Sequence, residues 1–268
     1  MRASPRVLAD SYPERLLDRH LKDLRFAEVT RALRALSAGY VEKRDEGGLD
    51  RALEGRGKRA AFALYYGALH FAAVRTLVAQ SGLAFDRGVA KDGAAVTLLN
   101  LGCGTGVCGA AWSALSAAPM RIHGVDRAGF VLQEAAWTYA TLGLQGRTSR
   151  SVLSALEGPR PDAVVLGWAL NEFDPAERLR VAEAVRAFVA RGTRLLVIEP
   201  VSRRVTPWWD EWMARASAVP LRVLEARLRV ELHPKLTLLA RSAGLKADVL
   251  PLKVAFTTPN DGEESKRP

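Results

Sequence analysis

The most constraining segment of this 268-residue chain is an apolar run that ends in glycines. Residues 95–101 read AVTLLNL and residues 102–106 read GCGTG, directly before a helical pattern. An apolar run of this length is typical of a buried parallel strand. Glycines at a strand-to-helix turn let a ligand approach the backbone, close to the free N–H groups of the helix. The segment predicts a ligand-binding turn, and a glycine-rich turn without a ligand is the less favoured alternative.

Strand and helix patterns alternate around this turn. Helices are predicted at 106–117, 127–142 and 175–190, and further strands at 120–125, 148–153, 162–168 and 194–198. This alternation implies right-handed crossovers and a parallel, doubly wound sheet. Residues 224–232 alternate between apolar and charged side chains, which predicts a half-exposed strand. A last strand is predicted at 247–256, where Pro251 indicates an edge position or a bulge. We predict an α/β, doubly wound, mostly parallel Rossmann-like sheet.

The first third of the chain predicts helices. Apolar residues recur at helical spacing over 12–40, and the segment 59–80 is apolar on most faces, as expected of a buried helix. The glycine- and arginine-rich stretch 42–58 between them is predicted as a loop. We therefore divide the chain into a helical N-terminal region at 1–90, a cofactor-binding Rossmann-like domain at 91–258 and a disordered tail at 259–268.

Neither a membrane span nor a secretion signal is predicted. The longest apolar run, Arg59 to Arg75, is interrupted by His70 and is short for a bilayer. The first residues lack the apolar core of a signal peptide. Two cysteines cannot build a disulfide framework. We expect a cytoplasmic protein with no membrane partner.

The net charge of +10 is unevenly distributed along the chain. Residues 1–90 carry a net +5 and residues 200–255 another +5, whereas residues 91–199, with 11 basic and 10 acidic side chains, carry only +1. A positive surplus suggests a polyanion such as nucleic acid, and a general preference for surface arginine is the alternative. If the charge has a functional meaning, it places the partner surface on the two flanks.

Two kinds of ligand fit the glycine turn. Gly104, Gly106 and Gly109 satisfy the spacing of a dinucleotide fingerprint, and Asp126 follows 22 residues after Gly104, where a carboxylate accepts ribose hydroxyls. An adenosyl cofactor fits the same pattern. No Gly-Lys-Ser/Thr ending is present, which excludes a nucleoside-triphosphate loop.

The string Asn100-Leu-Gly-Cys-Gly-Thr-Gly106 resembles the first motif of class I S-adenosylmethionine-dependent methyltransferases, over roughly residues 95–200. The resemblance implies that the glycine loop contacts the methionine part of S-adenosylmethionine and that the acidic residue after the second strand binds the ribose. Asn100 departs from the Asp or Glu usual in the family. The cofactor-binding residues that the resemblance implies are Asn100, Gly102, Cys103, Gly104, Gly106, Asp126, Arg127, Ser151, Val152 and Trp168.

A narrower similarity concerns two short motifs, Leu170-Asn171-Glu172 and Glu199-Pro200. Together with the helical N-terminal region, they resemble the ribosomal small-subunit methyltransferase-like family. This similarity implies rRNA or a ribosomal particle as the acceptor. The mitochondrial members carry a cysteine set for an iron–sulfur cluster, and this chain lacks it. The open alternatives are a small-molecule methyltransferase with a helical lid and a non-catalytic, cofactor-binding ribosome assembly factor; a dinucleotide oxidoreductase is less favoured.

Asn171 and Glu172 are the candidate catalytic residues, since they follow the fourth strand where an open α/β sheet binds its ligand. The equally weighted alternative is structural: Asn171 or Asp174 caps the next helix, and the helix dipole stabilises the carboxylate of Glu172 near the helix N-terminus. No metal is expected, because Cys103 and Cys108 lack a second ligand pair and are better explained as small packed residues.

Three further groups have a structural and a functional interpretation. His70 could cover the cofactor, but a buried, satisfied histidine is the more frequent case. His233 is a weak base candidate. Trp208, Trp209 and Trp212 follow two arginines and could stack on unpaired bases, although burial in the core is favoured.

Overall fold

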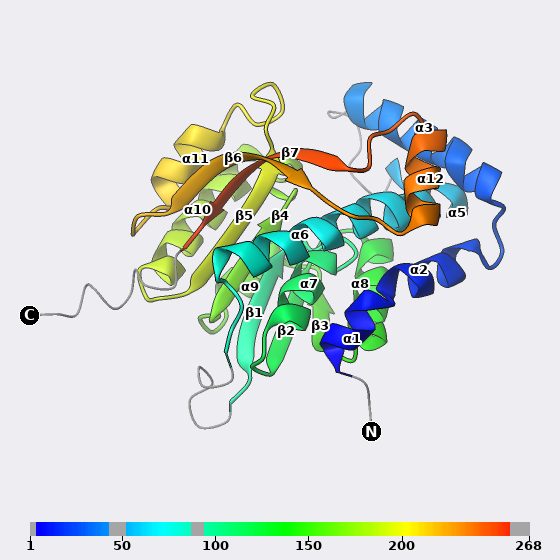
Figure 1. Ribbon diagram of the computed structural model, residues 1–268. Coiled ribbons are helices and arrows are strands. Elements are labelled where there is room, and N and C mark those ends of the chain that lie inside the picture. The colour runs from blue at the N-terminus through cyan, green and yellow to red at the C-terminus, as the bar shows by residue number, and fades with distance from the viewer. Residues whose placement is uncertain (1–3, 43–51, 87–93, 258–268) are drawn as a thin grey trace, which may run out of the picture.

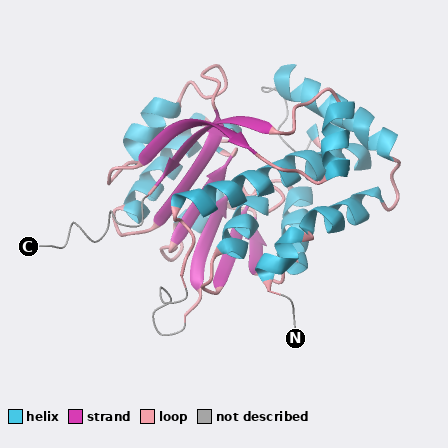
Figure 2. Cartoon of the chain, in the orientation of Figure 1, coloured by secondary structure: helices cyan, strands magenta, loops and turns pink. Residues whose placement is uncertain are grey.

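The computed structural model describes residues 4–42, 52–86 and 94–257. In these residues a seven-stranded sheet runs through the protein, with helices on both faces (Figures 1 and 2). The strand order is β3-β2-β1-β4-β5-β7-β6; β1 to β5 are parallel, and β7 runs antiparallel to both of its neighbours. The predicted doubly wound, mostly parallel α/β fold is confirmed. The strands are β1 (Val96–Leu101), β2 (Met120–Val125), β3 (Gln145–Ser149), β4 (Ala163–Gly167), β5 (Arg194–Pro200), β6 (Arg222–Arg229) and β7 (Val249–Phe256).

The helices form two layers. Buried side chains of α7, α8 and the N-terminal helices pack on one face of the sheet, and those of α9, α10 and α11 pack on the other. The helices are α1 (Pro5–Asp10), α2 (Tyr12–Leu21), α3 (Phe26–Glu42), α5 (Arg56–Ala61), the π-helix η1 (Phe62–Gly67), α6 (Ala68–Ser81), α7 (Val107–Leu115), α8 (Gly129–Thr141), α9 (Val152–Leu156), the 3₁₀ turn η4 (Leu170–Glu172), α10 (Pro175–Val189), α11 (Trp209–Ala216) and α12 (Pro234–Ser242).

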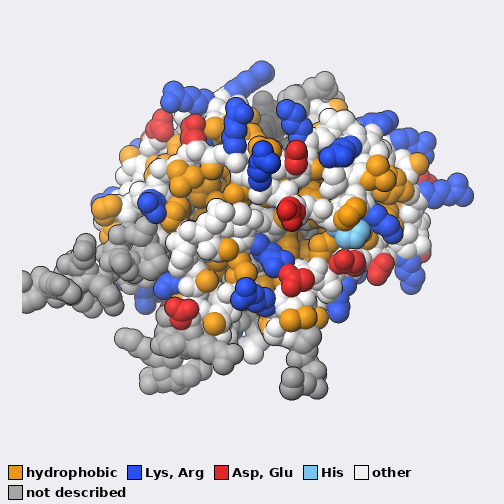
Figure 3. All heavy atoms as spheres, viewed as in Figure 1, with side chains coloured by type: hydrophobic (Ala, Val, Ile, Leu, Met, Phe, Trp, Pro, Cys, Tyr) orange, Lys and Arg blue, Asp and Glu red, His pale blue; other side chains and the backbone are white. Residues whose placement is uncertain are grey.

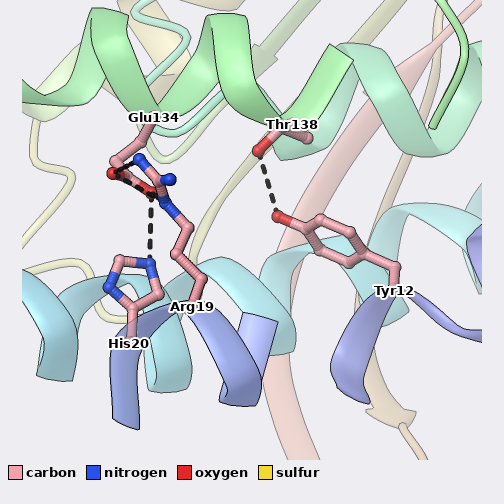
Figure 4. Close-up of polar contacts among 5 residues, drawn as sticks. All are labelled: Tyr12, Arg19, His20, Glu134 and Thr138. Carbon is pink, nitrogen blue, oxygen red and sulfur yellow. Dashed lines mark hydrogen bonds and ion pairs between the residues drawn. The ribbon is translucent and has the colours of Figure 1, made fainter. Parts of the chain in front are cut away.

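The N-terminal helices share the core of the sheet. Tyr12 of α2 is 1% exposed and packs against Phe71 of α6, with ring centroids 4.7 Å apart and planes tilted by 42°. Its hydroxyl lies 3.1 Å from the hydroxyl of Thr138 in α8. Two turns further along α2, the Arg19 guanidinium donates to both carboxylate oxygens of Glu134, and His20 contacts the same carboxylate at 3.1 Å (Figure 4). The N-terminal region is thus tied to α8 by a buried hydroxyl pair and an ion-pair cluster.

The longest helical run is continuous from Arg56 to Ser81, across the π-helical turn. At 26 residues it is long enough and apolar enough to cross a bilayer by length and composition alone, so the expectation that this stretch is too short is wrong. However, 67% of its most apolar window is buried inside the protein. That burial is typical of a core helix, and Gly82, with φ +69°, ends the run.

Several predicted boundaries differ from the structure. The strand predicted at 148–153 lies earlier, at 145–149, because Ser151 caps a short helix there. The helix predicted at 12–40 is interrupted between Leu21 and Phe26. Pro251 lies on an inner strand and not at an edge; its missing N–H is tolerated because β5 pairs with β7 only from Leu252 onwards. The disordered tail predicted at 259–268 lies outside the described residues.

The predicted half-exposed strand at 224–232 is the outer strand β6, beside β7. Leu228 is buried, but Leu224 on the same face is 36% exposed. The alternation was therefore correct as a strand signal, although the apolar face is covered at only one end.

Candidate functional site

A cavity of about 580 Å³ lies at the carboxyl ends of β1, β2 and β4. Its floor comes from the glycine loop that follows β1, and its walls come from η1 and α6, from the turn after β4, and from residues 250–252 of β7. Parallel strands place their carboxyl ends at one edge of a sheet, which is where ligands bind in open α/β folds. The N-terminal region therefore contributes one wall of the cavity.

The glycine loop adopts a backbone that other residues resist. Gly102, Gly104 and Gly106 have φ values of +58°, +51° and +78°. A Cβ atom on Gly102 would lie 2.4 Å from that of Ala169, and one on Gly106 would lie 2.9 Å from Ala135. A Cβ on Gly104 would meet nothing within 4 Å. Two of the glycines thus allow close packing, and the third leaves open space beside the cavity.

Asp126 follows β2 and lines the cavity. Its Oδ2 accepts from the backbone N of Gly104 at 2.9 Å, and its Oδ1 accepts from the backbone N of Ala128 at 3.1 Å. The carboxylate is thereby held against the glycine loop. Arg127 lies at the exposed rim and forms an ion pair with Glu177 in the first turn of α10.

Trp168 at the end of β4 has the one left-handed backbone among the described non-glycine residues, with φ +54°. Its backbone N donates to Ile198 of β5 at 2.8 Å. Its indole stacks on the imidazole of His70 from α6, with centroids 3.6 Å apart and planes 3° from parallel. A strained backbone held by neighbouring structure is typical of functional sites. His70 thus lines the cavity and is half-buried there.

The next turn carries Asn171, whose side chain is fixed from β5. Glu199 is completely buried; its Oε1 accepts from the backbone N of Leu170 and its Oε2 from Nδ2 of Asn171, both at 2.9 Å. Asp174, not Asn171, caps α10 by accepting from Glu177 N at 2.8 Å. Asn171 and Glu172 both line the cavity, with Glu172 at the exposed rim.

The wall from the N-terminal region is aromatic and neutral. Phe62, Tyr65 and Tyr66 of η1 line the cavity. Burial, and then the neighbouring Tyr65, raises the pKa of Tyr66 to about 12, and burial lowers the pKa of His70 to about 3. These groups are therefore uncharged near neutral pH. The sequence signal for this wall was the apolar helix, but periodicity could not show that it faces the glycine loop.

Three of the predicted cofactor-binding residues are not part of the cavity lining: Gly106 lies within the glycine loop beside it, and Asn100 and Ser151 lie further away. Asn100 is completely buried in β1 beneath the loop, 3.0 Å from where a Cβ on Gly109 would lie. Ser151 is exposed and caps α9 by accepting from Ser154 N at 3.1 Å. The structure brings the remaining seven to the cavity lining. They are Gly102, Cys103, Gly104, Asp126, Arg127, Val152 and Trp168.

The other candidate residues from the sequence lie in the core or at a helix end. Cys103 and Cys108 are buried free thiols, and burial raises the pKa of Cys108 to about 12. In the described part of the chain, no group of three or more His, Cys, Asp or Glu residues could hold a metal ion. Trp209 and Trp212 are each 4% exposed in the core. His233 caps α12 and is not among the described residues lining the cavity.

No protein-family model matches the chain, and no curated protein matches it either. Solved structures do resemble it at low identity. A putative O-methyltransferase from Nostoc punctiforme is 15% identical, with 86% of this chain and 69% of that chain covered and a TM-score of 0.48. A precorrin-6y C5,15-methyltransferase from Geobacter metallireducens is 11% identical, with 68% of this chain and 84% of that chain covered and a TM-score of 0.48. A SAM-dependent methyltransferase from Aquifex aeolicus is 13% identical, with 71% of this chain and 91% of that chain covered and a TM-score of 0.44. This likeness assigns neither a substrate nor residue roles.

Proposed function

We propose that this protein is an S-adenosylmethionine-dependent methyltransferase. The observation that carries the proposal is the cavity in which a left-handed glycine loop and the carboxylate of Asp126 meet at the end of β1 and β2. The cavity volume of about 580 Å³ is in the range of small-molecule and cofactor sites.

The residues at the cavity fit this cofactor. The open space at Gly104 admits a ligand against the backbone, and a carboxylate such as that of Asp126 suits ribose hydroxyls as a hydrogen-bond acceptor. The aromatic faces of Tyr66 and Trp168 suit a cationic sulfonium. When bound, S-adenosylmethionine supplies an electrophilic methyl group for transfer to a nucleophile.

A dinucleotide fits the cavity less well. Its pyrophosphate needs the exposed N-terminus of the helix after the glycine loop. Here Thr105 and Val107 at the start of α7 are 4% and 3% exposed, because η1 covers them at Gly67; a Cβ there would lie 3.2 Å from Thr105 Oγ1. This covered helix end supports an adenosyl cofactor over NAD.

The acceptor is proposed to enter beside Asn171 and Glu172. Glu199 accepts a hydrogen bond from the side-chain NH₂ group of Asn171. The side-chain carbonyl oxygen of Asn171 can therefore accept a hydrogen bond from the methyl-accepting substrate. Glu172, at the rim, is the proposed group for removing a proton. Burial lowers the pKa of His70 to about 3, which makes its imidazole a weak base for this role.

The aromatic wall favours a small or single planar acceptor group over an extended surface. Phe62, Tyr65 and Tyr66 enclose the cavity on the side where an acceptor would lie. This supports the small-molecule methyltransferase with a helical lid. An rRNA or ribosomal acceptor, a purely binding role in ribosome assembly, and a cytoplasmic location remain predictions from the sequence.

The cofactor assignment is tested by calorimetry with S-adenosylmethionine and with NAD. We expect binding of the former only, and we expect Asp126→Asn to weaken it by about tenfold or more, since hydrogen bonds to a charged group contribute roughly 1.5–3 kcal/mol. Asp162→Asn is the matched control, because Asp162 also accepts from a backbone N–H, that of Thr97, at the opposite end of the sheet. An unchanged dissociation constant in Asp126→Asn would refute the assignment.

The acceptor class is tested by offering labelled methyl donor with total RNA, protein and metabolite extracts. Label in the metabolite fraction supports the small-molecule proposal. Label in RNA supports the sequence-based rRNA prediction instead. Binding of the cofactor without label in any fraction points to the non-catalytic alternative.

A further inference from the structure

A second recess lies at the opposite, amino-terminal ends of the strands. It has a volume of about 490 Å³, and its described lining comes from β1, β2, β3, α9 and the loop before β4. Its lining shares no residue with that of the cofactor cavity. Nothing in the proposed methyl transfer uses it.

The recess exists because one crossover helix is short. α9 has five residues, which span about 8 Å at 1.5 Å per residue. A five-residue strand such as β3 spans roughly 16 Å. Val152 at the start of α9 lines the cofactor cavity at the carboxyl ends of the strands, and Ala155 near its end already lines the recess. The amino halves on the same face are left uncovered.

The uncovered face is basic. The parallel register places Arg121 beside Gln145 and His123 beside Arg147, so these four side chains share one face of β2 and β3. Arg160 reaches the same recess from the loop before β4. Three arginines therefore line one recess, although they are up to 39 residues apart in sequence. The guanidinium of Arg160 also donates to the backbone carbonyl of Arg191.

No carboxylate balances this charge within the recess. The described lining includes no Asp or Glu, and no ion pair is recorded for Arg121, Arg147 or Arg160. The adjacent Asp162 already accepts from both the backbone N and the hydroxyl of Thr97.

A neutral histidine orders part of the site. Arg147 lies within hydrogen-bonding distance of His123 Nδ1 at 3.2 Å, and His123 Nε2 contacts Ser149 Oγ at 2.8 Å. Burial, and then the charge of Arg147, lower the pKa of His123. With Nδ1 as acceptor from Arg147, Nε2–H donates to Ser149, which fixes the ring beside the guanidinium.

We propose that this recess binds a phosphate group carried by a nucleotide or by a nucleic acid strand. Guanidinium groups match phosphate oxygens in geometry, and a group of charge near −2 balances three arginines better than a single carboxylate does. The site is independent of the cofactor cavity. It would give the protein a second, anionic ligand or a contact for a phosphate-bearing partner.

The probe is inorganic pyrophosphate, followed by proton NMR of the four histidine rings of the full-length protein. An anion bound beside Arg147 offsets its positive field, so we expect a saturable shift at His123 and a rise in its pKa. The signals of His20, His70 and His233 should not move. S-adenosylmethionine should instead perturb His70, which lines the other cavity, so the two proposals fail or succeed separately.

The variant is Arg121→Gln, because no hydrogen bond or ion pair of this side chain is recorded in the structure. We expect it to weaken pyrophosphate binding by about tenfold or more, the size of a lost charge-assisted hydrogen bond. Arg222→Gln, on the exposed outer strand β6, is the matched control and should leave binding unchanged. Equal losses in both variants, or no saturable shift at His123 at millimolar pyrophosphate, would overturn the proposal.

Two further ligands identify the source of the phosphate. If a nucleic acid strand is the natural ligand, a short oligoribonucleotide binds more tightly than a nucleoside monophosphate, and its affinity falls steeply with salt. If a free nucleotide is the natural ligand, the monophosphate binds at least as tightly. If both ligands shift the NMR signals of His70 and not those of His123, the result would contradict binding at the recess.

Discussion

The two ends of the sheet are built in different ways. At the carboxyl end, three left-handed glycines, a strained Trp168 and an aromatic wall from the N-terminal helices enclose a cavity that the carboxylate of Asp126 also lines. At the amino end, strands β1 to β3 are left partly uncovered by the short α9, and arginines line an open recess. The first site depends on backbone geometry and burial, whereas the second depends on charge.

The surface shows where the remaining charge lies. Lys and Arg side chains follow the upper edge of the view in Figure 3, and the exposed arginines after β5 and on β6 belong to the C-terminal flank. They are Arg203, Arg204, Arg222, Arg227 and Arg229. The sequence assigned partner surfaces to the flanks only. The amino-end recess adds a basic site inside the segment that is nearly neutral in sum.

The largest expected effect is at the packed side of the glycine loop. Gly102→Ala places a Cβ 2.4 Å from Ala169 on a left-handed backbone, so we expect a loss of about 3 kcal/mol in the free energy of unfolding, from strain and overpacking together. Urea denaturation measures it. A loss below about 1 kcal/mol would contradict the view that the site at the carboxyl end depends on its backbone geometry.

The next prediction compares how a histidine at each end of the sheet changes the pH dependence of stability. The pKa of His70 is about 3 in the folded protein, below the 6.5 of the unfolded chain, so its contribution is complete above pH 6.5 and is lost as the pH falls toward 3. Between pH 7.5 and pH 5 the wild type should lose about 2 kcal/mol more than His70→Phe.

Urea midpoints at the two pH values test this difference. At the amino end, burial and Arg147 also lower the pKa of His123, but by less than burial lowers that of His70. His123→Phe should therefore change the pH dependence in the same direction and by less. Parallel curves for wild type and His70→Phe would contradict a buried, neutral imidazole over the cavity.

The smallest effect distinguishes binding from strain. Gly104 at the carboxyl end and Gly192 before β5 both have positive φ values and open space at the Cβ position. Each change to Ala should cost about 1 kcal/mol of stability, because each alanine must adopt a left-handed backbone. Only Gly104→Ala should weaken S-adenosylmethionine binding in calorimetry, because only its Cβ enters the cavity. Equal affinities in the two variants would place the cofactor elsewhere.

Much of the fold followed from local patterns. The strand–glycine–helix turn and the bounds of β2 were predicted closely, since apolar runs between glycines leave few alternatives. The strand at 148–153 was misplaced because the five residues of β3 are only partly buried and carry no apolar periodicity. Asp126 was found from its spacing alone, because both the loop and the second strand end at the same edge.

The sequence by itself determined a doubly wound sheet, a glycine loop and the carboxylate that faces it. Only the tertiary structure decided that His70 stacks on Trp168, that Glu199 holds Asn171, and that three arginines line one recess at the amino ends of the strands. The physical reason is that local periodicity reports which residues are buried, whereas the strand order decides which buried or charged residues become neighbours. A sum of +1 over the middle of the chain therefore conceals two sites of different character at opposite ends of one sheet.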